Sequence, residues 1–190
     1  VAAKNHLHAL NATSETPKAV LKDAKLAITQ LEKRIDRLTA EALVLIGKHP
    51  ELKRILALLI GIKGVGETSA IALMGELLLL PPGLSHREWV KFAGLDPRAF
   101  GSGKSVHKKT RISKAGNRHI RAALYFPALS AKQHDKHVKA YFQHLMANGK
   151  TPLQGVCAVM RKLLHAIHGM LKNNEPFDNT RFYAIPECNG

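Results

Sequence analysis

The sequence predicts an all-α protein, in which a coiled-coil or helical arm is followed by a compact helical domain that contains a helix-hairpin-helix. Apolar residues recur at helical spacing, and no segment alternates between apolar and polar residues over the length of a strand. With 45% hydrophobic residues, a chain of 190 residues can bury a core. We expect the arm at residues 1–49, the helical domain at 50–178 and a C-terminal tail at 179–190.

The arm is predicted from apolar residues that are spaced three and four apart in alternation. They are Leu21, Ala24, Ile28, Leu31, Ile35, Leu38, Ala42 and Leu45. This spacing is that of a coiled-coil seam, and the residues between carry charges of both signs, as on a solvated face. One interpretation is self-association through the seam, which would give a homodimer or a larger complex. The other is a helix that packs on its own domain.

A helix-hairpin-helix is predicted after Pro50. A helix from Glu51 to about Gly61 leads into the turn Ile62-Lys63-Gly64-Val65-Gly66, and another helix runs from Glu67 to about Leu80. The glycines permit a tight turn and leave the first amides of the following helix open to a phosphate, so contact would be with the nucleic-acid backbone and not the bases. Lys63, Gly64 and Gly66 are the candidate contacts. The alternative is an ordinary αα-turn.

Further helices are predicted downstream. Ser85 and Glu88 have the spacing of a capping box that opens a short helix to Phe92. Ser113 is a candidate N-cap for a helix from Lys114, which would place Lys114, Arg118, Arg121 and Tyr125 on one face beside the Ser102 loop. Two more helices are expected at about 136–147 and 153–172, and the chain is expected to be irregular from Asn173.

The charge balance predicts a polyanionic partner. Lys and Arg number 29 against 14 Asp and Glu, for a formal net charge of +15 and a pI near 10.1. Between Asp96 and Glu175 the only acidic residue is Asp135, against fifteen Lys and Arg. No apolar run is long enough to cross a membrane, no signal peptide is evident, and Cys157 and Cys188 occur in unrelated contexts. We expect a cytoplasmic protein with free thiols and no membrane partner.

A serine lies in the most basic stretch of the chain. Residues 98–121 contain eight Lys or Arg and no carboxylate, and within them Ser102 is flanked by Gly101 and Gly103. The Gly-Lys-Ser string is not a nucleotide-binding loop, because the position that should be glycine is Arg98. A two-metal nuclease would need several carboxylates that this half of the chain lacks, and the Gly-x-Ser-x-Gly elbow of serine hydrolases is absent.

Two functions of Ser102 remain open from the residues alone. It could be a nucleophile that attacks a phosphodiester, with His107 as a candidate base, or it could only donate a hydrogen bond to a phosphate. In either case the neighbouring cations would contact phosphates and stabilise negative charge. These candidates are Lys104, Lys108, Lys109, Arg111, Lys114, Arg118 and Arg121.

Several motifs together resemble a known family. In chain order they are Ile62-Lys-Gly-Val-Gly-Glu, Phe92-Ala-Gly-Leu-Asp-Pro-Arg98, Ser102-Gly-Lys-Ser-Val106, Arg111-Ile-Ser-Lys-Ala-Gly-Asn117, Arg121-Ala-Ala-Leu-Tyr125, Met160-Arg-Lys-Leu163 and Pro176-Phe-Asp178. Their order and spacing resemble the C-terminal transposase domain of the one-ten family of bacterial insertion-sequence transposases, which includes the Piv-type DNA invertases. The resemblance covers roughly residues 24–178.

The resemblance implies a recombinase built from two parts. An N-terminal RuvC-like domain with four acidic residues would bind Mg²⁺, and a coiled coil would join it to a helical domain with a catalytic serine. The family serine matches Ser102, which would become covalently joined to a DNA end. Ser105 is the second serine of the motif, and Ser105 and Arg111 are candidates for catalytic support; Gly101 stands where the family has a polar or charged residue.

The resemblance also implies what the chain would bind. The acidic domain is not in these residues, so we expect a C-terminal fragment that has no cofactor of its own and is inactive alone. The expected partners are DNA and, as in RNA-guided members of the family, a bridge RNA, in a nucleoid-associated bacterial protein. The rival interpretation is a non-catalytic DNA- or RNA-binding module in which Ser102 only contacts phosphate.

Overall fold

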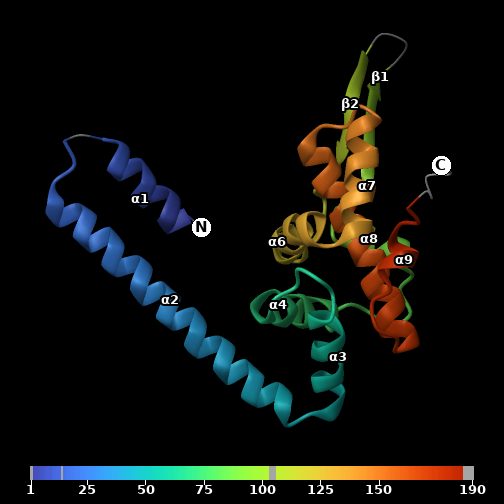
Figure 1. Cartoon of the computed structure of the whole chain (residues 1–190), viewed down its shortest axis with the longest axis horizontal. Coiled ribbons are helices and arrows are strands. Elements are labelled where there is room, and N and C mark those ends of the chain that lie inside the picture. Colours follow the sequence, from blue (N-terminus) through green and yellow to red (C-terminus); the bar gives the residue numbers. More distant parts are fainter. Residues whose placement is uncertain (1, 14, 103–105, 186–190) are drawn as a thin grey trace. The chain divides into compact units, whose positions relative to one another are not determined.

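The computed structural model describes residues 2–13, 15–102 and 106–185, and within residues 99–110 it describes the backbone alone. The chain divides into two compact units, residues 1–49 and 50–190 (Figure 1). Among the described residues helices predominate, so the all-α class is confirmed.

The first unit is a helical hairpin. Helix α1 (Ala2–Ala12) runs antiparallel along the first half of α2 (Lys18–Gly47), and the Lys4 ammonium lies 2.7 Å from a Glu32 carboxylate oxygen. The predicted seam is half-buried at its start, whereas Leu31, Ile35 and Leu38 are each about half exposed, at 48%, 50% and 49%. Most of the apolar stripe beyond α1 therefore faces outward in the isolated chain.

The second unit is a helical domain built around its longest helix. Its helices are α3 (Pro50–Ile60), α4 (Glu67–Leu77), α5 (His86–Phe92), α6 (Arg118–His134), α7 (Lys136–Ala147), α8 (Pro152–Asn173) and α9 (Asn179–Phe182). Helix α8 begins at a capping box made by Thr151 and Gln154, with Pro152 in its first turn. It packs against α3, α5, α6, α7 and α9, and its residues Val159, Leu163, Leu164 and Ile167 are almost completely buried.

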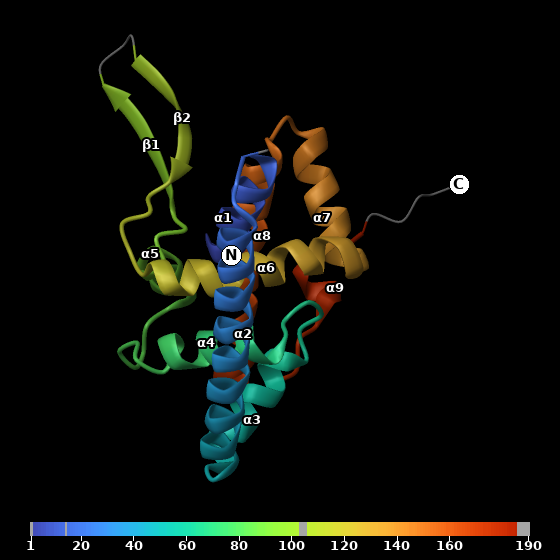
Figure 2. The ribbon, with the colours of Figure 1, turned by 90° about the vertical axis from the view of Figure 1, so that its left-hand side faces the viewer.

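A β-hairpin projects from this domain, and the sequence did not predict it. Strand β1 (Pro97–Ser102) pairs antiparallel with β2 (Val106–Ile112), as Figure 2 shows. The register is irregular between Arg98 and Phe100, because these residues pair with Arg111 and Lys108 and so two steps of β1 face three of β2. The strands lack the apolar alternation that would have predicted them from the sequence.

Two local predictions were wrong. Helix α6 begins at Arg118 and not at Lys114, because Asn117 is its N-cap; the Asn117 side chain accepts hydrogen bonds from the His119 and Ile120 amides. Lys114 has φ of 54°, a left-handed conformation that cannot continue a helix. The chain after Asn173 is not wholly irregular either, because α9 forms there and Phe182 is only 3% exposed.

The helices predicted at 51–61, 136–147 and 153–172 are present, as is the capping box of Ser85 and Glu88. Helix α4 ends at Leu77, three residues earlier than expected. None of the helices in the described ranges is long and apolar enough to cross a membrane.

Candidate nucleic-acid interface

At the base of the β-hairpin, the segment before β1 (residues 92–96) and the segment after β2 (residues 113–117) are joined by hydrogen bonds. We call these two segments the clamp. The Asn117 amide donates to the Phe92 carbonyl at 2.7 Å, and the Lys114 amide donates to the Gly94 carbonyl at 3.0 Å. Both the amide and the hydroxyl of Ser113 donate to Asp96, to its carbonyl and its carboxylate respectively. Two of the motifs that carry the family resemblance, at 92–98 and 111–117, therefore meet here.

Glycines allow these two segments to approach closely. A Cβ at Gly116 would lie 2.2 Å from the Phe92 carbonyl oxygen, and Gly94 has φ of +64°. The Arg121 guanidinium completes the clamp, because its Nη1 donates to the Ala93 carbonyl at 2.9 Å and to the Gly116 carbonyl at 3.2 Å. Arg121 thus ties α6 to the hairpin base, whatever else it contacts.

The backbone register puts Ser102 at the far end of the hairpin. Ser102 is the last residue of β1 and pairs with Val106, five residues beyond Pro97. At the usual rise per strand residue this is about 17 Å from the clamp. Lys104 and Ser105 lie outside the described residues, and for Ser102, Lys108 and Lys109 only the backbone is described. Lys108 pairs with Phe100 in the register.

Two arginines face each other across the hairpin. Arg98 and Arg111 are directly opposite in the register, and both side chains are exposed. Residues opposite each other in an antiparallel pair share a face, and like charges there repel.

The turn between α3 and α4 contains two glycines with different conformations, since Gly64 has positive φ and Gly66 is extended. Gly64 has φ of +101°, and a Cβ there would lie 2.8 Å from the Ala131 amide nitrogen of α6. Gly66 is the N-cap of α4, and a Cβ there would meet nothing within 4 Å. Lys63 is exposed, while Ile62 and Val65 are buried. Gly64 is therefore needed for packing against α6, whereas Gly66 faces open space.

The candidate phosphate-contact residues predicted from the sequence do not form one compact site. Lys114, Arg118 and Arg121 lie at the hairpin base, and the cationic face expected beside Ser102 is not there, because the length of the hairpin separates Ser102 from α6. Arg118 is exposed in the first turn of α6. Lys63, Gly64 and Gly66 form a separate surface at the α3–α4 turn.

A further group of cationic and titratable side chains gathers where α5 packs on α8, and the sequence patterns did not single it out. We call it the α5–α8 cluster; it consists of His86, Arg87, Arg161, His165 and His168. The ring centroids of His86 and His165 are 4.8 Å apart, and those of His86 and His168 are 6.0 Å apart. On α8 the spacing of four and three between Arg161, His165 and His168 was the available signal.

Positive charge accumulates at this cluster. Burial lowers the pKa of His165, and the nearby His86, Arg161, His168 and Arg87 lower it further. Burial also raises the pKa of the Cys157 thiol, an effect that the positive charges of Lys114 and Arg161 oppose. Arg161 therefore acts electrostatically on His165 and, together with Lys114 of the hairpin base, on Cys157.

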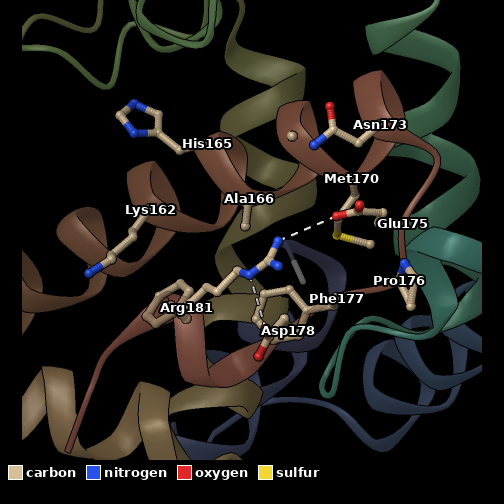
Figure 3. A pocket seen from close by; sticks show the side chains of 12 residues that line it. Lys162, His165, Ala166, Met170, Asn173, Glu175, Pro176, Phe177, Asp178 and Arg181 are labelled. Carbon is tan, nitrogen blue, oxygen red and sulfur yellow. Dashed lines mark hydrogen bonds and ion pairs between the residues drawn. The ribbon is translucent and has the colours of Figure 1, made fainter.

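A pocket of about 280 Å³ lies on the other side of His165, between α8 and the C-terminal segment (Figure 3). In it Arg181 pairs with Glu175 and Asp178, with N–O distances of 3.4 and 3.2 Å. At the pocket edge the Lys162 ammonium lies 4.4 Å from the Tyr141 ring centroid and 5.2 Å from that of Phe182, and burial lowers its pKa. The Lys162–Phe182 contact joins α8 to α9, and the two carboxylates among the pocket residues are both paired with Arg181.

The described residues contain no group of three or more His, Cys, Asp or Glu side chains that could hold a metal ion. Acidic side chains of the domain have structural partners instead. Asp135 caps α7 by accepting from the His137 and Val138 amides, and Glu76 accepts from Asn117.

Comparison with known proteins shows what this domain is similar to. Residues 56–143, from α3 to α7 and including the hairpin, match the model of the transposase IS116/IS110/IS902 family. This part of the chain is therefore similar to the transposase domain that the family model describes. The match includes both the α3–α4 turn and the clamp at the hairpin base.

Individual relatives extend the similarity beyond the transposase domain. The chain is 32% identical over 154 residues to a pilin gene-inverting protein of Moraxella bovis and 33% identical over 157 residues to that of Moraxella lacunata. It is 24% identical over 156 residues to an uncharacterized 43.6 kDa protein of insertion element IS110 from Streptomyces coelicolor. Each match covers 80% of this chain, but only 45%, 45% and 36% of the respective relatives. The chain thus spans less than half the length of these relatives.

Proposed function

We propose that the chain is part of a DNA recombinase and that its transposase domain supplies a serine nucleophile, Ser102, for strand exchange. The observation that supports this is the position of Ser102 at the end of β1, in a hairpin that lies within the family match at residues 56–143. A residue at the end of a projecting hairpin can enter a groove or the active centre of another domain. The relatives whose name describes an activity are gene-inverting proteins.

The proposed reaction is a transesterification. The Ser102 hydroxyl oxygen attacks the phosphorus of a DNA phosphodiester, a new O–P bond forms, and the bond to one sugar oxygen breaks. The proton of the serine passes to a base, for which His107 is the candidate in this chain, and the sugar oxygen leaves as a hydroxyl after protonation. In the second step a different sugar hydroxyl attacks the phosphorus of the serine–DNA intermediate, a new phosphodiester forms, the bond to the Ser102 oxygen breaks, and the serine regains a proton. The number of phosphodiester bonds is therefore unchanged.

Positive charge around Ser102 would stabilise the extra negative charge that develops on the phosphoryl oxygens. We assign this function to Lys104, Lys108 and Lys109, and catalytic support to Ser105. Arg111 pairs with Arg98, four residues from Ser102 along β1, so its proposed support is a phosphate contact nearer the hairpin base.

The wider surface is proposed to hold the DNA backbone. Lys114, Arg118 and Arg121 would contact phosphates near the hairpin base, and Lys63 with the amides beside Gly64 and Gly66 would do so at the α3–α4 turn. Arg121 is already bound to two carbonyls through Nη1, so we expect its contribution to be smaller than that of Arg118.

The rest of the complex follows from the resemblance and is proposed with it. A separate acidic domain would bind Mg²⁺ and act on the same DNA, and a bridge RNA is the proposed second nucleic acid. The exposed residues Leu31, Ile35 and Leu38 of α2 are the proposed self-association seam. Without the acidic domain we expect this chain to bind duplex DNA but not to cleave it.

The test uses this chain joined to the acidic domain of a gene-inverting relative, with Mg²⁺ and the DNA that the relative inverts. We expect a denaturant-resistant protein–DNA adduct on the peptide that contains Ser102, and its loss in Ser102→Ala, while Ser105→Ala retains it. Recombination without an adduct, or an adduct undiminished in Ser102→Ala, would leave the domain as a non-catalytic binding module.

A further inference from the structure

We propose that the α5–α8 cluster is a further phosphate-binding surface of the domain, which binds the backbone of duplex DNA beside the hairpin base. The proposal rests on the proposed DNA function and adds to it a surface outside both the Ser102 hairpin and the α3–α4 turn. The proposed phosphate contacts are Arg87 and Arg161, and the His165 ring lies beside them.

The cluster combines rigid placement with accessible charge. Helix α5 is held by its capping box and packs on α8, where Trp89 meets the His168 ring at 4.9 Å between centroids. The His168 Nε2 lies 2.8 Å from the Leu84 carbonyl oxygen, which orients that ring. His86 and Arg87 are exposed at the start of α5, and Arg161 and His165 are half-buried beside them on α8. Binding would therefore need little reorganisation of these helices.

The charges of the cluster lack partners of opposite sign. In the part of the chain that the structure describes, neither Arg87 nor Arg161 is in an ion pair. Of the neighbouring carboxylates, Glu88 is held by the Ser85 amide and hydroxyl. Glu175 and Asp178 both pair with Arg181, and Figure 3 shows the His165 ring turned away from these ion pairs. Clustered like charges repel in the free protein, so a polyanion is the partner that stabilises this arrangement.

Position favours DNA as that polyanion. Helix α5 leads directly into the clamp, where the Phe92 and Gly94 carbonyls accept hydrogen bonds from the Asn117 and Lys114 amides. Against the effect of burial, Lys114 of the clamp and Arg161 of the cluster both lower the pKa of the Cys157 thiol, so both lie near it. A duplex that reaches the hairpin base would thus meet further positive charge along α5 and α8. The histidines are not arranged as metal ligands, since no metal-competent group occurs in the described residues.

The binding test measures the affinity of the full chain for a fluorescein-labelled, mixed-sequence duplex over a range of salt concentrations. We expect Arg87→Gln/Arg161→Gln to weaken binding roughly tenfold, and to lower the slope of log Kd against log salt by about 0.9 for each phosphate that the variant no longer neutralises. Arg87→Lys/Arg161→Lys should retain most of the affinity. The matched control, Lys139→Gln/Lys150→Gln, removes the same charge from exposed residues outside the cluster.

The protonation test separates specific contact from net charge. Phosphate favours the protonated imidazole, so binding should take up protons and the affinity should rise as the pH falls from about 8 to about 6. We expect His165→Gln to reduce this pH dependence and the exposed control His134→Gln to leave it unchanged. Circular dichroism and thermal melting would establish that each variant is folded.

The outcomes distinguish the two proposals. Parent protein that binds duplex DNA, with a cluster variant that binds equally well and with the same salt slope, would overturn this further surface alone. Parent protein without affinity for DNA would overturn the proposed function together with this surface. A cluster variant that loses affinity for single-stranded RNA but not for duplex DNA would show that the surface takes a different partner from the one proposed.

Discussion

The Asn117 side-chain amide donates to a Glu76 carboxylate oxygen at 2.6 Å and so joins the start of α6 to α4. The same side chain caps α6 through its oxygen, while the Asn117 backbone amide binds the Phe92 carbonyl at the hairpin base. One residue therefore connects the α3–α4 unit, α6 and the clamp that supports the hairpin. Its position after the last basic residues of the hairpin explains how the projecting element is anchored in the domain.

Replacing Asn117 tests this connection. Asn117→Ala removes the cap and the bond to Glu76, and we expect it to lower the free energy of unfolding by about 2 kcal/mol in urea titrations. Asn117→Asp keeps a capping oxygen but places a second carboxylate against Glu76, so it should also destabilise the domain, and Glu76→Gln should restore much of that loss. If Asn117→Asp and Asn117→Asp/Glu76→Gln are equally stable, the contact between residues 117 and 76 does not contribute to the stability of the domain.

The clamp should be sensitive to a single methyl group. Because a Cβ at Gly116 would overlap the Phe92 carbonyl oxygen, we expect Gly116→Ala to destabilise the domain by about 1–3 kcal/mol. Gly75, within α4, is the matched control, since a Cβ there meets nothing within 4 Å. Gly75→Ala should stabilise by about 0.5–1 kcal/mol through helix propensity. Urea unfolding gives the free energy of unfolding of both variants. If Gly116→Ala is no less stable than Gly75→Ala, the two segments of the clamp can move apart without cost.

The sequence predicted most helices of the domain because their apolar spacing, capping boxes and proline positions are local signals. It did not predict the hairpin, since the strands at 97–102 and 106–112 are basic and have no apolar alternation. The Ser113 N-cap was wrong for a related reason. Ser113 binds Asp96 across the clamp, a contact between residues seventeen positions apart that no local pattern reveals.

For the candidate site, sequence motifs found the serine and the turn glycines, but not their distance from one another. Arg121 was expected to face phosphate, yet its Nη1 binds two carbonyls of the clamp. The α5–α8 cluster was missed because its residues come from two helices about seventy-five positions apart in the chain, and only packing of α5 on α8 brings them together.

The α3–α4 turn gives a test that separates folding from binding. Gly64→Ala should destabilise the domain, because Gly64 has positive φ and touches α6. Gly66→Asp should leave stability unchanged or raise it, since aspartate is a good N-cap and favours the positive end of the helix dipole. The same carboxylate would repel a phosphate at the α4 amides, so we expect Gly66→Asp to weaken duplex DNA binding several-fold. A folded Gly66→Asp variant with undiminished DNA affinity would show that the α3–α4 turn contributes to packing but does not bind phosphate.

Acid should weaken the domain through two capping carboxyls. The backbone and hydroxyl of Ser85 lower the pKa of Glu88, and the Thr180 hydroxyl lowers the pKa of Asp178. Their stabilising contribution is therefore present above the ordinary values of 4.5 and 3.8 and is lost as the pH falls through the lowered native values. Urea midpoints measured from about pH 7 to about pH 3 should fall less steeply in Glu88→Gln/Asp178→Asn than in the parent. If the urea midpoints of both proteins fall equally with decreasing pH, groups other than Glu88 and Asp178 cause the acid sensitivity.

The C-terminal segment should be part of the cooperative fold. Phe182 is almost completely buried, and its ring centroid lies 5.7 Å from that of Tyr141 on α7 and 5.2 Å from the Lys162 ammonium of α8. We expect Phe182→Ala to cost about 3 kcal/mol, as for other buried aromatic truncations, and to raise hydrogen exchange in α9 and in the neighbouring turns of α7 and α8. Tyr183→Ala, at a half-buried neighbour, should cost less. Because α9 and the α5–α8 cluster lie on different sides of His165, Phe182→Ala should leave DNA affinity unchanged wherever the variant is still folded, and a parallel loss of affinity would mean that the two surfaces are coupled through α8.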